Sequence, residues 1–232
     1  MASASAGESW EYTTQGGIEV RVDVTPIEPE ASVEDLIDRL DSARGVLLSS
    51  SYEYPGRYTR WDMGFVDPPL VVTSQSQEVR IEALNERGQA LLPLLQDAMR
   101  DVNGVSLGEA ANTFLSFHIE RSVERFEEED RSRQPSSFSA VRAIVELFAG
   151  PDEHIGLYGA FGYDLAFQFE PIELQLTRPE DQRDLVLYIP DELIVVDHQG
   201  GIAERRCYEF TFDKGTTDGL NRGGARQAYQ PD

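Results

Sequence analysis

Short apolar runs with the two-residue period of a β-strand recur along the chain, and they constrain its fold more than any other feature. Residues 17–27 alternate valine or isoleucine with charged or polar residues, which predicts a strand with one face in water. Further strand-like runs cover residues 45–51, 57–65, 70–73, 78–84, 154–161, 184–198 and 203–212. The runs at 70–73 and 78–84 have the spacing of a hairpin. We therefore expect an α+β fold of mostly antiparallel sheets with flanking helices.

Three stretches have the apolar stripe of a helix instead, at residues 33–40, 91–99 and 137–148. Ser32 and Asp35 resemble a capping box, so the first helix is expected to start there and to end at Gly45. Pro93 is expected in the first turn of the second helix, where a proline is tolerated. Gly150 and Pro151 mark the end of the third helix.

The composition limits the kinds of partner that the chain can have. A chain of 232 residues can bury one sizeable core, and 40% hydrophobic residues exclude a disordered protein. The formal charge of -22 repels phosphate backbones and acidic lipid headgroups, so neither nucleic acid nor a membrane is expected as a partner. Lys214 is the only lysine, and high-GC codon usage can explain this preference for arginine. The excess of acidic residues can also reflect adaptation to a saline cytoplasm.

Cysteine content and targeting signals indicate a reducing compartment. Cys207 is the single cysteine, so an intrachain disulfide and a cysteine-based metal cluster are both excluded. Residues 1–10 lack the basic and apolar parts of a secretory signal, and no run approaches the roughly 18 apolar residues that span a bilayer. We expect a cytoplasmic location.

The sequence carries no general catalytic signature. It has no P-loop, no Gly-x-Ser-x-Gly and no His-Glu-x-x-His. Glycines interleave with aromatic residues at 156–164, a pattern that favours close backbone packing over a dinucleotide loop. His118, His154 and His198 are each interpreted as structural or surface residues, and the charged run at 124–136 as a solvated loop. No catalytic residue is therefore assigned.

Three stretches together resemble a known family. They are VLLSSS at 46–51 followed by YPGRYTRWD at 54–62, GLYGAFGYD at 156–164, and YIPDELIVVDH at 188–198. In order and spacing they resemble the amino-terminal region of anthranilate synthase large subunits (component I), especially the type fused to a glutamine amidotransferase. The resemblance covers residues 17–212.

The resemblance implies a function and a division of the chain. The family makes anthranilate from chorismate with Mg²⁺, using ammonia from the amidotransferase. Its catalytic and metal-binding residues lie in a carboxy-terminal chorismate-binding region that this chain lacks, so the resemblance implies no catalytic residue, cofactor or metal here. It divides the chain into a leader at 1–16, the amino-terminal domain at 17–212 and a linker at 213–232 toward that region.

The resemblance also implies half of a tryptophan feedback site. In the family, a Leu-Leu-Glu-Ser type segment and a basic residue some ten positions later contribute to it. Leu48, Ser49 and Ser50 match the segment, although Ser49 stands where glutamate is common. Arg60 matches the basic residue, or Arg57 does if the alignment has a short gap.

Other interpretations stay open at this point. The serines at 49–51 can equally satisfy backbone groups at a strand end. The chain can be a stand-alone small-molecule-binding module, or the equivalent region of aminodeoxychorismate synthase, whose amino-terminal region is similar.

Overall fold

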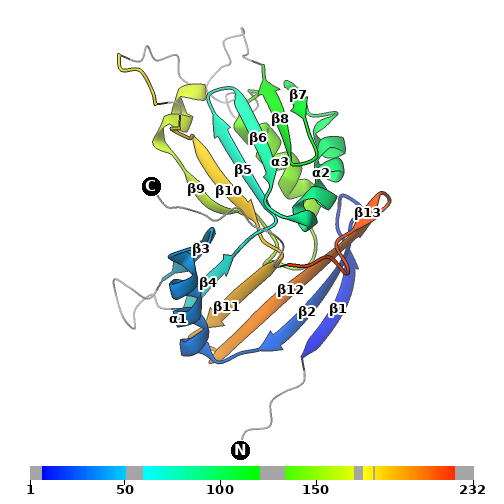
Figure 1. Cartoon of the computed structure of the whole chain (residues 1–232), viewed down its shortest axis with the longest axis vertical. Coiled ribbons are helices and arrows are strands. Elements are labelled where there is room, and N and C mark those ends of the chain that lie inside the picture. Colours follow the sequence, from blue (N-terminus) through cyan, green and yellow to red (C-terminus); the bar gives the residue numbers. More distant parts are fainter. Residues whose placement is uncertain (1–6, 51–59, 121–133, 170–174, 180, 223–232) are drawn as a thin grey trace, which may run out of the picture.

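The computed structural model describes residues 7–50, 60–120, 134–169, 175–179 and 181–222. Within them the chain forms two antiparallel sheets, one above the other in Figure 1, with helices packed against them. The expected α+β class with antiparallel sheets is confirmed.

The first sheet holds the strands from both ends of the described chain. Its order is β1 (Glu8–Thr13), β2 (Glu19–Pro26), β12 (Ile202–Phe212), β11 (Glu192–Asp197), β4 (Trp61–Val66) and β3 (Gly45–Ser49), and β13 (Gly215–Thr216) also pairs with β12. Helix α1 (Pro29–Leu40) packs on the β3 and β4 end of this sheet. Its buried Leu36 lies against Gly64, where an added Cβ would meet the leucine side chain at 2.4 Å.

The second sheet has the order β7 (Val105–Ala110), β8 (Phe114–Ile119), β6 (Glu78–Ala83), β5 (Leu70–Gln75), β10 (Leu185–Ile189) and β9 (Tyr158–Phe161). Helices α2 (Glu86–Met99) and α3 (Ser137–Phe148) pack together against it. A short 3-10 helix, η2 (Tyr163–Gln168), follows β9.

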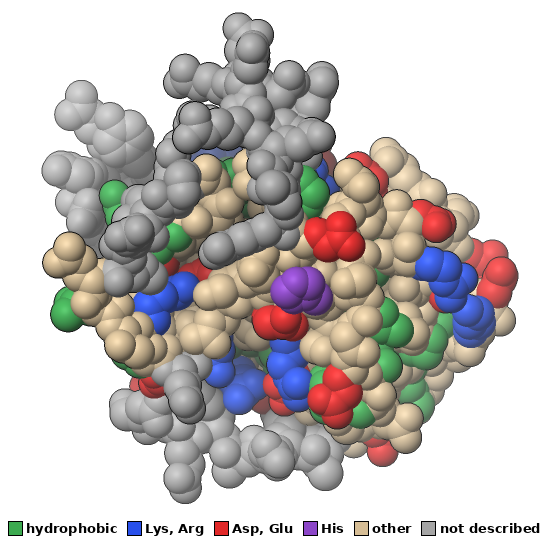
Figure 2. Space-filling model, turned by 90° about the horizontal axis from the view of Figure 1, so that it is seen from above, with side chains coloured by type: hydrophobic (Ala, Val, Ile, Leu, Met, Phe, Trp, Pro, Cys, Tyr) green, Lys and Arg blue, Asp and Glu red, His purple; other side chains and the backbone are tan. Residues whose placement is uncertain are grey.

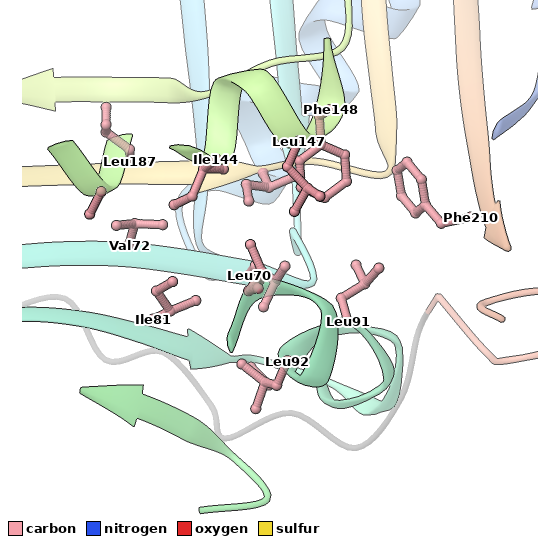
Figure 3. Close-up of a cluster of buried hydrophobic side chains, with 14 of the residues drawn as sticks. Leu70, Val72, Ile81, Leu91, Leu92, Ile144, Leu147, Phe148, Leu187 and Phe210 are labelled. Atoms are coloured by element: carbon pink, nitrogen blue, oxygen red, sulfur yellow. The ribbon is translucent and has the colours of Figure 1, made fainter. Parts of the chain in front are cut away.

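One hydrophobic core joins the two sheets. Figure 3 shows side chains of β5 and β6 meeting those of α2 and α3, with Phe210 of β12 reaching in from the first sheet. The rings of Phe148 and Phe210 pack edge to face with centroids 5.6 Å apart. Because the apolar faces of both sheets end in this core, the described residues form one packed body.

A buried ionic group, the Arg87 cluster (Arg87, Asp191, Glu209 and Arg222), ties α2 to the first sheet. Arg87 is fully buried; its Nε donates to the Asp191 carboxylate and its Nη1 to Glu209 at 2.9 Å. It also donates to the carbonyl oxygen of Thr217 at 2.8 Å. Arg222 donates to Glu209 at 2.7 Å and lies 3.3 Å from Asp191. Residues 217–222 are therefore anchored at the junction of the two sheets.

Several sequence-based expectations hold. The 70–73 and 78–84 runs form the β5–β6 hairpin, and the third helix covers residues 137–148 as expected. The alternating run at 17–27 becomes β2, whose three valines are buried. Most of the charged run at 124–136 lies outside the described residues.

The boundaries of the first two helices were wrongly predicted. Helix α1 begins at Pro29, because the Glu28 carboxylate accepts the Ala31 amide at 2.8 Å and proline fits the first turn. It ends at Leu40, and Gly45 instead begins β3, where a Cβ would meet the Phe65 carbonyl oxygen at 2.1 Å.

Helix α2 begins at Glu86 rather than near Pro93. Asn85 caps it by accepting the Gly88 amide at 3.0 Å, so the start needs no proline. Pro93 lies inside the helix on its exposed side, where solvent can reach the carbonyl group that its missing amide leaves unpaired.

Both ends of the chain carry more structure than their composition indicated. Residues 8–13, expected within the leader, form β1 and pair along β2. Within 213–232, expected as a linker, residues 215–216 form β13 and Arg222 joins the Arg87 cluster. Among the described residues, no helix is long and apolar enough to cross a membrane.

Candidate functional site

The residues expected to bind an effector lie at the β3 end of the first sheet. Leu48 of β3 pairs with Met63 of β4, and Ser49 pairs with Asp62. Because successive strand residues point to opposite faces, Leu48 and Ser50 face one side of the sheet and Ser49 faces the other. The register therefore separates Ser49 from the two residues that flank it.

The Ser50 hydroxyl closes the end of the β3–β4 pair. It donates to the Trp61 carbonyl oxygen at 3.0 Å and accepts the backbone amides of Arg60 and Trp61, both at 3.2 Å. This is the backbone-satisfying role that the sequence left open for these serines. Ser50 thus holds Arg60 and Trp61 in place, with little hydrogen-bonding capacity left for a ligand.

Arg60 presents its charge on an exposed surface. About half of its side chain is exposed, and its Nη2 lies 3.5 Å from Oδ2 of Asp197. Its guanidinium lies 4.9 Å from the centre of the Trp61 ring, within cation–π range. Its carbonyl oxygen accepts the amide of His198 at 2.8 Å, so the backbone is fixed on both sides.

Asp197 is the last residue of β11 and lies opposite Trp61. Its Oδ1 accepts the backbone amides of Gln199 and Gly200, both at 3.0 Å. The Gly200 amide above all, with the Gln199 amide and Arg60, outweighs the effect of burial and lowers the pKa of Asp197. The carboxylate is therefore anionic and held in one orientation.

Apolar side chains surround this ion pair. Leu48 is 47% exposed, Trp61 is 38% exposed and Met63 is half-buried. Ile202 of β12 lies opposite Asp197 and is 57% exposed. We call Leu48, Ser50, Arg60, Trp61, Met63, Asp197 and Ile202 the candidate surface.

The opposite face of the same strands carries a different polar pair. Asp62 is buried and its Oδ2 lies 2.8 Å from Nε2 of His198. Ser49 lies on this face, beside Asp62. Of the four residues expected at the site, the structure brings Leu48, Ser50 and Arg60 to one area and places Ser49 behind it; Arg57 lies outside the described residues.

Sequence reasoning missed Asp197 and Trp61. Both lie within the recognised stretches at 54–62 and 188–198, so the sequence did contain a signal. Their meeting depends on the pairing of β4 with β11, which joins residues 136 positions apart. A reading of single motifs does not supply that register.

The other described histidines each lie beside a carboxylate. His118 lies 2.7 Å from Glu78 on an exposed strand, and His154 donates its amide to Asp152. Within the part of the chain that the structure describes, no group of three or more histidine, cysteine or acidic side chains could hold a metal ion.

The surface charge is mixed on the face seen from above. Figure 2 shows the Lys and Arg side chains of that face in small groups beside acidic ones. Among the side chains coloured there, basic groups form no broad patch of the kind that binds phosphate backbones.

Comparison with known proteins gives long matches to one family. The chain is 46% identical over 234 aligned residues, its whole length, to an anthranilate synthase of Azospirillum brasilense. It is 32% identical over 76% of its length to anthranilate synthase component 1 of Serratia marcescens. It is also 29% identical over 71% of its length to component 1 of Vibrio cholerae. No family model matches the chain.

The chain spans about a third of the length of these relatives: 32%, 34% and 31% in the same order. The matches confirm the resemblance that the three motifs indicated. The chain belongs to the anthranilate synthase component 1 family, as a homologue of part of those proteins.

Proposed function

We propose that this chain is the amino-terminal regulatory and scaffold part of an anthranilate synthase, that it contributes half of a tryptophan feedback site, and that it is not catalytic alone. The observation that carries this proposal is the fixed Arg60–Asp197 pair beside exposed Leu48 and Trp61. A free aromatic amino acid needs both charges for its head group and an apolar area for its ring.

The candidate surface fits one wall of such a site. Half of the Arg60 side chain and nearly half of Leu48 are open to solvent. Tight ligand sites usually bury most of a ligand, which this surface does not do by itself. We therefore propose that the chorismate-binding catalytic region supplies the opposite wall of the effector site. That region would also hold the Mg²⁺ that the reaction needs.

Regulation would then follow from binding across two parts of the protein. Tryptophan inhibits only if it binds one arrangement of the two parts more tightly than the other. We propose a glutamine amidotransferase, as a fused domain or a subunit, as the further partner, and the cytoplasm as the location. The three relatives described above are all anthranilate synthases, which favours anthranilate synthase over the related aminodeoxychorismate synthase.

The proposal is tested first by an activity measurement. The purified 232-residue chain, given chorismate, Mg²⁺ and ammonia, is expected to release no anthranilate, as followed by anthranilate fluorescence. A complete anthranilate synthase in the same assay is the positive control. Release of anthranilate by the chain alone would contradict the non-catalytic assignment.

The coding sequence after Asp232 separates the proposal from the stand-alone alternative. A chorismate-binding region in the same reading frame is expected. A stop codon at that point would favour an independent small-molecule-binding module.

A further inference from the structure

We infer that Asp197 accepts the ammonium group of a free α-amino acid while Arg60 binds its carboxylate, so that the candidate surface selects zwitterions. The inference rests on the proposed function and assigns each charge of the ligand's head group to one residue. Its basis is one anion and one cation, 3.5 Å apart, beside the partly exposed apolar side chains of Trp61 and Ile202.

The Asp197 carboxylate has one oxygen, Oδ2, that the backbone amides of the turn do not use. Oδ1 accepts the two amides of the β11–β12 turn, from Gln199 and Gly200. Oδ2 faces Arg60 at 3.5 Å, the long end of hydrogen-bonding distance. An oxygen with spare lone pairs beside a fixed backbone is a suitable acceptor for an ammonium group.

Arg60 is positioned in the same way from the other side. Its backbone is held by Ser50 and His198, and its guanidinium lies over Trp61. Half of the Arg60 side chain is open to solvent, against 13% of Asp197, and the two charged groups are 3.5 Å apart, so their direct contact is weak. A ligand that inserts its own two charges loses little when it replaces that contact. Arginine also binds carboxylates with two parallel hydrogen bonds.

The surrounding rows of side chains place an apolar group next to the ion pair. Trp61 and Ile202 are the cross-strand neighbours of Asp197, and one row further in lie Val195, Met63 and Leu48. Side chains opposite each other on neighbouring strands share a face; Val195 is buried, and the others form one partly exposed surface. A ligand held at Asp197 and Arg60 would rest its side chain on that surface.

Two nearby carboxylates fit the role less well. Asp62 faces the opposite side of the sheet and is bound to His198. Glu204 shares the face of Asp197, but its carboxylate is bound by Arg206, which also contacts Asp152. Glu204 is therefore the competing assignment to test.

The experiment compares three ligands that differ only in their charged groups. NMR shifts of the full 232-residue chain are followed with tryptophan, with tryptamine, which lacks the carboxylate, and with indole-3-propionate, which lacks the ammonium. High salt screens the net charge, which would otherwise attract tryptamine without specificity. Tryptophan at millimolar concentration is expected to bind more tightly than either analogue.

Substitution of Asp197 then tests the assignment directly. Asp197→Asn keeps an oxygen for the turn amides but removes the charge, so tryptophan and tryptamine are expected to bind about fivefold more weakly. Indole-3-propionate binding should not weaken. Arg60→Met should show the reverse selectivity, with weaker binding of tryptophan and indole-3-propionate. Glu204→Gln, the matched control, should change none of the three.

The outcomes separate the inference from the proposed function. If tryptophan binds but Asp197→Asn leaves the preference for an ammonium group unchanged, the role of Asp197 is overturned while the effector site stands. If Glu204→Gln removes that preference, the ammonium belongs to Glu204. If none of the ligands shifts any resonance, both the inference and the tryptophan half-site fail.

Discussion

An arginine–aspartate pair lies at each end of β11, and the two pairs differ in the burial of the arginine and in the direction of the aspartate pKa shift. Just before its first residue, Asp191 meets Arg87, which is fully buried and has further acceptors in Glu209 and the Thr217 carbonyl. At its end Asp197 meets Arg60 at 3.5 Å, and half of the arginine side chain is exposed.

The two pairs differ in their role: the Arg87–Asp191 pair stabilises the fold, whereas the Arg60–Asp197 pair can bind a ligand. Burial raises the pKa of Asp191 even with two arginines beside it, which indicates how costly that carboxylate would be without them. Backbone amides, above all that of Gly200, lower the pKa of Asp197, whose side chain is 13% exposed. The buried pair therefore serves structure, and the exposed pair remains available to a ligand.

The largest loss of stability is expected from Arg87→Met. The change leaves Asp191 and Glu209 buried with Arg222 as their remaining cation, so the free energy of unfolding should fall by about 3–5 kcal/mol. Urea denaturation followed by circular dichroism measures it. Arg142→Met, on an exposed position of α3, is the control and should stay close to the wild-type value. A loss below about 1 kcal/mol for Arg87→Met would mean that the cluster is not a structural anchor.

A second, smaller effect is expected from acid at Asp152, a buried carboxylate between α3 and β9 that pairs with Arg206 of the first sheet. Burial would raise the pKa of Asp152, but hydrogen bonds from His154 and the charge of Arg206 outweigh it and lower the pKa to about 2. A depressed pKa stabilises the fold above the unfolded-state value, and that stability is lost as pH falls from about 4 to about 2. The loss should be about 2 kcal/mol.

Asp152→Asn tests this acid dependence. The variant should be less stable at neutral pH and should lack this part of the acid-induced loss when urea midpoints are compared from pH 5 downward. An unchanged slope between wild type and variant would contradict the role of Asp152.

The smallest effect is expected at the exposed pair. Arg60→Met should change the free energy of unfolding by less than about 1 kcal/mol, because exposed ion pairs are weak. Molar salt should leave wild type and variant equally stable. If Arg60→Met destabilised as much as Arg87→Met, the exposed pair would be structural and less suited to a ligand.

The sequence predicted several elements of the fold but not β7 and β8, and it placed some helix ends wrongly. Periodicity located β2, the β5–β6 hairpin and α3, since their buried side chains repeat at regular intervals. It misplaced the start of α1, because the cap is a glutamate rather than the more common serine.

The ends of the chain were harder to predict for another physical reason. Residues 8–13 and 215–216 have few apolar residues, and they are ordered by pairing with strands distant in sequence. Arg222 is held by carboxylates from β12 and from the residue before β11. Such contacts depend on tertiary structure, which local composition does not encode.

The candidate site was predicted in part. The motifs pointed to Leu48, Ser50 and Arg60, and the structure places these residues together; their binding role remains a prediction. Asp197 was missed because its proximity to Arg60 follows from the β4–β11 register. The opposite orientation of Ser49 follows from strand alternation.

The length of β11 has a consequence for how a signal would travel. The strand is hydrogen-bonded on both sides, to β12 and β4, and at about 3.3 Å per residue its six residues span about 20 Å. Sliding it by one residue would turn every side chain to the wrong face, so small axial shifts are forbidden. The strand is therefore expected to move as a rigid element. A displacement of Asp197 on ligand binding would reach the anchored segment 217–222 only by tilting the whole sheet.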